Sequence, residues 1–272
     1  VEKCVKAPVS YLILAGLTNA FVLLLFPLLF SINFIFPWSI YCILLGSFLS
    51  IGIYIYMRAL QIEEVSRVIP LIYLEPLFVT LIAFFITKEV FSTQKYVGIV
   101  VLVISSILIS YTPGRKKRFS PALMLILLFD VIYAVYAVVL KYLMPLFNVP
   151  SIVFWTSLSF LVTVPILLSV RSIRNVFISD FKSLKRKAWI LRLMGMITYW
   201  GGLIPFYTAV SLGPISLISA VSSVQPFFVL IFSLFLSLFF PHIIKERFDK
   251  STLGTKLIAT CLLFIGNWLV LR

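Results

Sequence analysis

Apolar residues in this chain occur in blocks of about twenty, and these blocks restrict the fold more than any other feature. A helix rises about 1.5 Å per residue, so such a block is long enough to cross a hydrocarbon layer of about 30 Å. Backbone groups in lipid must be hydrogen-bonded within their own segment, which favours helices, and no block shows the alternation of a barrel strand. The sequence therefore predicts an all-α polytopic membrane protein.

The composition supports this prediction. Of the 272 residues, 62% are hydrophobic and 12% are charged, and the mean hydropathy is +1.14. A soluble domain is nearer to half apolar and a quarter charged, so a soluble enzyme, a nucleic-acid-binding protein and a disordered protein are excluded. The apolar blocks and the breakers between them predict nine spans, at 9–30, 37–59, 66–87, 95–112, 121–144, 149–170, 189–211, 214–239 and 251–271.

The net charge of +14 arises from Lys and Arg residues between the apolar blocks, such as those at 115–118. If nine spans alternate across the membrane, nineteen of the 23 basic residues, Arg192 among them, fall on one side. The other side holds only Lys88, Lys95, Lys141 and Arg272. Because a Lys/Arg excess marks cytoplasmic loops, we expect a plasma (inner) membrane protein with basic loops in the cytoplasm and the C-terminus outside.

The chain lacks the motifs of metal, cofactor and catalytic sites. Its three cysteines have no CxxC spacing, its single histidine is His242, and neither HExxH nor GxxxxGK[ST] occurs. We therefore expect no metal, no cofactor, no P-loop ATP hydrolysis and no enzymatic activity. The expected partners are the lipid bilayer and a small-molecule substrate, without nucleic acid, and the sequence predicts no particular oligomeric state.

A shift of 150 residues superposes two stretches of the chain without a gap. Identical pairs include Gly52 with Gly202, Ser66 with Ser216, and Pro76 with Pro226. The halves 1–114 and 121–272 hold four and five predicted spans, and a five-helix unit repeated once has inverted topology. Since the chain begins with Val, we expect a truncated sequence whose first repeat lacks its first helix. A genuine nine-helix protein is the alternative.

Several short motifs recur in the same order in both halves. The first half contains Tyr56-Met57-Arg58-Ala59-Leu60, Leu74-Glu75-Pro76-Leu77-Phe78, Lys88-Glu89 and Gly98. The second half contains Phe206-Tyr207-Thr208-Ala209, Gln225-Pro226-Phe227-Phe228, Lys245-Glu246 and Gly254. The chain thereby resembles the EamA repeat of the drug/metabolite transporter superfamily, and Lys141 resembles the basic residue that closes the first helix of each unit.

The resemblance implies ten helices in two inverted five-helix units around a central midplane cavity. It also implies a secondary transporter working by alternating access, here an exporter of small metabolites such as amino acids or amphiphilic compounds. A flippase for a lipid-linked sugar is an alternative, and a membrane-embedded enzyme is a further one. Family members usually keep both termini in the cytoplasm, which conflicts with the C-terminus that the charge count places outside.

Two acids lie well inside predicted spans, Glu75 in 66–87 and Asp130 in 121–144. A charge at the centre of a membrane helix costs about 2.5–3.5 kcal/mol on insertion scales, so such acids suggest a functional role. Because burial disfavours the ionised form, both are candidates for proton coupling. The alternative for Glu75 is a structural hydrogen bond, as its repeat equivalent Gln225 could also make.

The other candidates each have a functional and a packing interpretation. In the functional interpretation these residues contact substrate or lie at a helix bend. In the packing interpretation they lie at helix contacts or face lipid. The substrate or coupling candidates are Glu75, Asp130, Lys141, Tyr73, Tyr133, Trp200, Ser222 and Gln225. Ser222 and Gln225 belong to a polar stripe with Ser216, Ser219 and Ser223, and the helix-bend candidates are Pro76 and Pro226.

Overall fold

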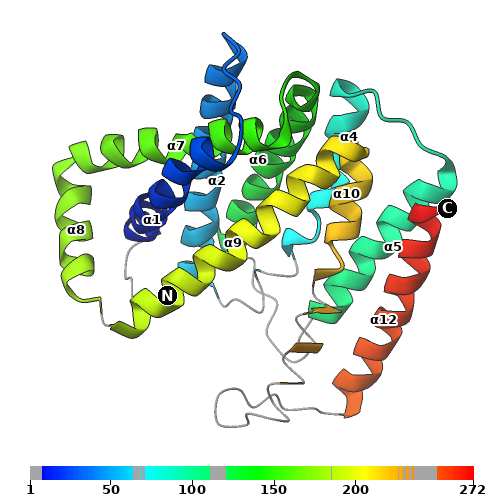
Figure 1. Cartoon of the computed structure of the whole chain (residues 1–272). Helices are drawn as coiled ribbons and strands as arrows, with labels where there is room; N and C mark the ends of the chain where they lie inside the picture. Colours follow the sequence, from blue (N-terminus) through cyan, green and yellow to red (C-terminus); the bar gives the residue numbers. More distant parts are fainter. Residues whose placement is uncertain are drawn as a thin grey trace. The chain divides into compact units, whose positions relative to one another are not determined.

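The computed structural model describes residues 8–63, 68, 71–110, 121–184, 186–225, 227–228, 231–232, 235 and 250–272. All regular elements in these ranges are helices, which confirms the all-α prediction (Figure 1). They are α1 (Pro8–Leu29), α2 (Trp38–Ile62), α4 (Glu75–Ile86), α5 (Thr93–Ser110), α6 (Pro121–Leu143), the 3-10 helix η1 (Met144–Leu146), α7 (Val149–Ser169), α8 (Arg171–Lys182), α9 (Arg186–Leu212), α10 (Ile215–Ser222) and α12 (Lys250–Leu271).

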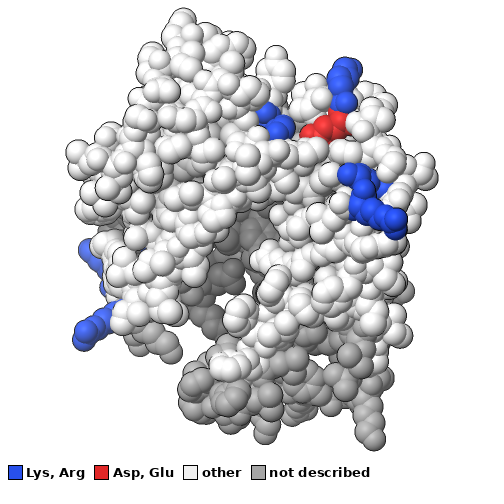
Figure 2. All heavy atoms as spheres, turned by 45° about the vertical axis from the view of Figure 1, so that its right-hand side comes forward, with Lys and Arg blue, Asp and Glu red and all other residues white. Residues whose placement is uncertain are grey.

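Among the described residues, four helical stretches are long and apolar enough to cross a membrane: Val9–Leu29, Trp38–Ile62, Pro121–Leu146 and Val149–Ser169. Three shorter apolar helices accompany them, at Glu75–Ile86, Thr93–Leu108 and Ile258–Leu271. Large apolar side chains are exposed on them, as expected of helices that face lipid. Most of the described side chains visible in Figure 2 are uncharged, and the basic ones form no continuous patch. The chain is a multi-pass membrane protein.

Two of the predicted spans are interrupted near their middle. In the span predicted at 66–87, Tyr73 and Leu74 form a turn, and α4 begins at Glu75 with Pro76 in its first turn. Proline is tolerated there because its missing N–H would have no helical partner. In the span predicted at 214–239, α10 ends at Ser222 and a turn follows, while Pro226 lies outside the described residues.

The structure adds a helix between the spans predicted at 149–170 and 189–211. Val170 adopts an extended conformation that ends α7, and α8 follows it over twelve residues (Figure 1). The α8 helix is amphipathic, with Ile173, Val176 and Phe177 at helical spacing among charged residues. The apolar blocks did not predict α8 because charged residues alternate with its apolar ones. An amphipathic helix needs only one apolar face, so it contains no continuous apolar block.

The described helices form two compact units. One unit comprises residues 1–58 and 139–213, with α1, α2, α7, α8 and α9, and is called unit 1 below. The other comprises residues 59–138 and 214–272, with α4, α5, α10, α12 and most of α6, and is called unit 2. Each unit contains helices from both halves of the sequence. The predicted domains 1–114 and 121–272 divide the chain by its internal repeat instead, and they stay a prediction.

Unit 1 is organised around α1 and α7. The α1 helix packs against α7, α8 and α9, and α7 also packs against α8 and α9. Asn148 caps α7 by accepting a hydrogen bond from the Ser151 N–H at 2.9 Å. A Cβ atom placed on Gly46 of α2 would overlap the carbonyl oxygen of Thr156, so α2 and α7 touch where only glycine fits.

Unit 2 contains the pairs α5–α12 and α4–α10, and α5 also packs against α4 and α10. Figure 1 shows α5 and α12 side by side, and a Cβ atom on Gly98 of α5 would lie 2.8 Å from the Val270 side chain of α12. Ser106 donates a hydrogen bond to the carbonyl of Ser223 at 2.6 Å, which satisfies an acceptor where α10 ends. The buried core comprises Ile99, Leu102, Ala220, Ala259, Leu263 and Val270.

Candidate functional site

The first residue of α4, Glu75, contacts α10 within unit 2. The hydroxyl of Ser219 donates a hydrogen bond of 2.6 Å to Oε1 of Glu75. The two residues are 144 positions apart in the chain and meet because α4 and α10 pack against each other. A hydrogen bond to a carboxylate is stronger than one between neutral groups, so this contact ties the interrupted end of α4 to α10.

The second acid, Asp130, lies on α6 in the same unit and is completely buried. Neither of its carboxyl oxygens has a hydrogen-bond partner among the described residues. It interacts electrostatically with Glu75 of the same unit, and these two residues are called the acid pair below. An ionised carboxylate that is buried without a hydrogen bond is costly, and two neighbouring negative charges raise that cost further.

A third acid, Glu89, fixes the beginning of α10. Lys88 has the left-handed φ of 56° just after α4, and the N–H of Glu89 returns to the carbonyl of Ala83 at 3.4 Å. The Glu89 carboxylate accepts the N–H groups of Ile215 and Ser216 at 2.9 and 3.1 Å. It also accepts the Ser216 hydroxyl at 2.6 Å. The backbone N–H of Glu89 therefore contacts the end of α4, and its carboxylate contacts the beginning of α10, so that Glu89 joins the two helices.

The predicted tyrosines also belong to unit 2. Tyr73 is buried in the turn that precedes α4. Tyr133 lies three residues after Asp130, and its ring is 6.0 Å from those of Phe129 and Tyr136. The acid pair is thus accompanied along α6 by a row of aromatic rings, a surface that can contact an apolar or aromatic group.

The polar residues predicted at the end of α10 do not join the acid pair. Ser222 is exposed, and its hydroxyl donates to the carbonyl of Ile218 at 2.8 Å. Gln225 is exposed as well. Ser219, a member of the same stripe, is instead the residue that binds Glu75.

Two further candidates lie in unit 1. The ammonium group of Lys141 donates to the carbonyl of Val210 at 2.7 Å, near the end of α9, where a cation also stabilises the helix dipole. The indole N–H of Trp200 donates to Oδ1 of Asn19 at 3.2 Å, and the Trp200 ring lies 5.2 Å from that of Phe26. Both contacts are within unit 1.

Sequence reasoning did not identify Arg192 as a site residue and counted it only among the charges on the cytoplasmic side. The structure places Arg192 inside α9 and only 6% exposed, with hydrogen bonds to α1. The signal was present: Arg192 falls inside the span predicted at 189–211, and apolar residues flank it on both sides.

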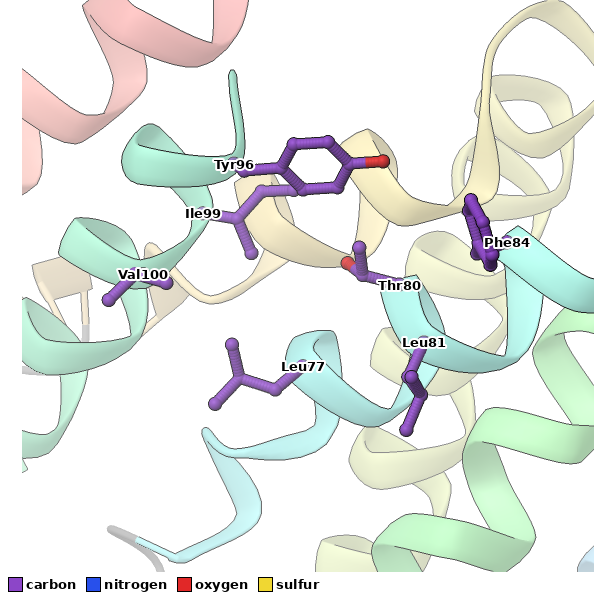
Figure 3. A pocket seen from close by; sticks show the side chains of 7 residues that line it. All are labelled: Leu77, Thr80, Leu81, Phe84, Tyr96, Ile99 and Val100. Atoms are coloured by element: carbon purple, nitrogen blue, oxygen red, sulfur yellow. The ribbon is translucent and has the colours of Figure 1, made fainter. Parts of the chain in front are cut away.

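A pocket of about 390 Å³ opens between α4 and α5 of unit 2 (Figure 3). The two hydroxyl groups that line it make hydrogen bonds to neighbouring backbone: Thr80 donates to the carbonyl of Pro76, and the Tyr96 hydroxyl accepts the Phe91 N–H. None of the predicted site residues lines it. The lining residues are Leu77, Thr80, Leu81, Phe84, Tyr96, Ile99 and Val100.

Comparison with known proteins agrees with the motifs. Comparison with curated proteins finds no match. A solved chain described as "Crystal structure of protein" has a TM-score of 0.68 and 16% identity, covering 97% of this chain and 88% of that chain, which shows a shared fold. Residues 5–111 match the model of the EamA-like transporter family. The match agrees with the resemblance inferred from the motifs, and this first part of the chain is similar to the EamA-like transporter family.

Proposed function

We propose that the protein is a secondary transporter of small solutes that couples their movement to protons through Asp130 and Glu75. The observation that carries this proposal is the Asp130 carboxyl group, which is completely buried and has no hydrogen-bond partner among the described residues. A group in this environment is stable only when neutral, and it ionises once water or a cation reaches it. Uptake and release of one proton would then accompany a change of conformation.

The interruptions of α4 and α10 support a mechanism of alternating access. Helices that break inside the membrane offer polar groups there, as the contact between Glu75 and Ser219 illustrates. In the proposed mechanism the acid pair is accessible to one side of the membrane at a time. Two inverted repeats would supply the two alternating states.

The proposed substrate is a small metabolite such as an amino acid, or an amphiphilic compound, and the proposed direction is export. The match to a transporter family supports the class of function, and the aromatic rings beside Asp130 favour a solute with an apolar part. A flippase for a lipid-linked sugar stays the alternative. Competition by water-soluble amino acids for transport in reconstituted vesicles is expected of the small-solute transporter and not of the flippase. The proposed location is the plasma (inner) membrane, with basic loops inside and the C-terminus outside.

The test compares Asp130→Asn with the unmodified chain in proteoliposomes. Uptake of radiolabelled amino acids, supplied as a panel, is measured under an imposed pH gradient and as exchange at equal pH on both sides. We expect the substitution to abolish uptake driven by the gradient and to preserve exchange, because exchange needs no net proton movement. Infrared spectroscopy of the purified protein should also lose an absorption band of a protonated carboxyl group.

Asp180→Asn is the matched control, because Asp180 is a buried acid of α8 in unit 1. It should retain both uptake and exchange. If Asp130→Asn keeps the same response to the pH gradient as the unmodified chain, proton coupling through Asp130 is rejected. If no member of the panel is transported by the unmodified chain, the proposed substrate class is wrong, and the infrared band still tests the protonated state of Asp130.

A further inference from the structure

The guanidinium group of Arg192 is buried between α9 and α1 in unit 1. Its Nε and Nη2 atoms donate to the hydroxyl oxygen of Thr18 at 2.9 and 2.7 Å. Nη2 also donates to the carbonyl of Ala15 at 3.2 Å, and the Tyr11 ring centroid lies 5.9 Å from the guanidinium carbon. All of these neighbours are neutral, so the contacts orient the cation without balancing its charge.

The described part of unit 1 offers this cation no counter-ion. The carboxylate there is Asp180 on α8, and the hydrogen bonds of Arg192 to described residues go instead to Thr18 and Ala15. A buried charge is normally paired, and removing it from water without a partner is costly. Since Arg stays protonated in proteins, it cannot avoid the cost by losing its proton. The buried guanidinium group of Arg192 therefore lacks a balancing negative charge among the described residues of unit 1.

One edge of the guanidinium group is available. Nη1 donates to none of the residues that the structure describes, whereas Nε and Nη2 are occupied by α1. Asn19, the next residue after Thr18, uses its Oδ1 to accept the Trp200 indole N–H, which leaves an amide N–H₂ group on the same helix. Donors of this kind bind oxygen atoms that carry negative charge, and a planar guanidinium group suits carboxylate and phosphate best.

We propose that Arg192 is the binding residue for an oxyanion, a carboxylate or a phosphate group, which enters unit 1 and completes the charge balance of Arg192. The anion is carried either by a solute or by a lipid headgroup. Tyr11 and Trp200, on the same two helices, supply aromatic surface nearby, so an aromatic carboxylate is the first probe to use. This inference goes beyond the proposed proton coupling, which involves acids of unit 2 only.

The experiment measures thermal unfolding of the purified full chain in a neutral detergent at constant ionic strength. Sodium phenylacetate and inorganic phosphate are titrated as probes, and phenylacetamide serves as the neutral equivalent of phenylacetate. A second arm uses nanodiscs of phosphatidylcholine with and without phosphatidylglycerol. We expect at least one anion to raise the unfolding temperature in a saturable way, with no effect of phenylacetamide.

The substitution Arg192→Gln should weaken the apparent affinity for that anion at least about tenfold, the usual effect of removing a hydrogen-bonded charge. Arg174→Gln is the matched control, because Arg174 is an exposed cation on α8 of the same unit, and it should change nothing. Stabilisation by phosphatidylglycerol alone, if lost in Arg192→Gln, assigns the oxyanion to lipid. Stabilisation by phenylacetate or phosphate assigns it to a solute.

Two results would overturn the proposal: no stabilisation of the unmodified chain by any anion in either arm, or equal stabilisation of Arg192→Gln. If Arg192→Gln does not fold, Arg192→Lys replaces it, because it keeps the charge and loses the planar group of donors. Its affinity for the anion should fall several-fold, and an unchanged affinity contradicts recognition by the guanidinium group.

Discussion

Replacing Glu89 by alanine removes the three hydrogen bonds that hold the first turn of α10 to the end of α4. The carboxylate accepts two N–H groups, of Ile215 and Ser216, and the Ser216 hydroxyl, at 2.6–3.1 Å. A lost helix cap costs about 0.5–2 kcal/mol, the charge at a helix N-terminus about 0.3–1 kcal/mol, and a side-chain hydrogen bond about 1 kcal/mol. We therefore expect Glu89→Ala to lower the free energy of unfolding by about 2–3 kcal/mol.

Glu89→Gln separates the charge from the shape of the side chain. The amide keeps one acceptor oxygen, but its N–H₂ group faces donors that it cannot bind. The expected loss is about 1–2 kcal/mol, smaller than that of alanine. Because the cap acts partly through Ser216, a double-mutant cycle of Glu89→Ala with Ser216→Ala should show a coupling energy of about 1 kcal/mol.

The assay is reversible unfolding of the full chain in mixed micelles, driven by increasing dodecyl sulfate and followed by tryptophan fluorescence. Gln94→Ala, an exposed substitution in the first turn of α5, serves as the control and should stay within about 0.5 kcal/mol of the unmodified chain. The capping argument fails if Glu89→Ala and Glu89→Gln both unfold like the unmodified chain. It also fails if the cycle with Ser216 shows no coupling.

Two other predictions test packing and orientation. Gly46→Ala should destabilise the chain by about 1–3 kcal/mol in the same assay, because its new methyl group would meet the backbone of α7. Gly202→Ala should be close to neutral, because no described residue has an atom within 4 Å of the new methyl group. Equal effects of the two substitutions would contradict the close approach at Gly46. In a chain without its native cysteines, Lys116→Cys should react with a membrane-impermeant thiol reagent only after the cells are opened, and Lys95→Cys should react in intact cells. The reverse pattern would invert the proposed topology.

The length and spacing of the apolar blocks predicted the long apolar helices, because helical hydrogen bonds are local and apolar length decides whether a helix can cross the bilayer. They did not predict the amphipathic α8. The position of Pro76 was equally informative, since proline cannot occupy a helix interior without removing a hydrogen bond. The motifs around Glu75 and Lys88-Glu89 indicated the resemblance to the EamA-like family, which the match over residues 5–111 supports, because they are short, ordered features of the chain itself.

Only the tertiary structure decided which side chains meet. In helices such as α1 and α9 the apolar residues do not gather on one face, so their periodicity does not reveal which face packs against protein and which faces lipid. The contact of Glu75 with Ser219 joins residues 144 positions apart. The burial of Arg192 likewise depends on α1, which lies more than 170 residues earlier in the chain. Charge along the sequence therefore indicated where loops lie, whereas the packing of distant helices determined which charges are buried.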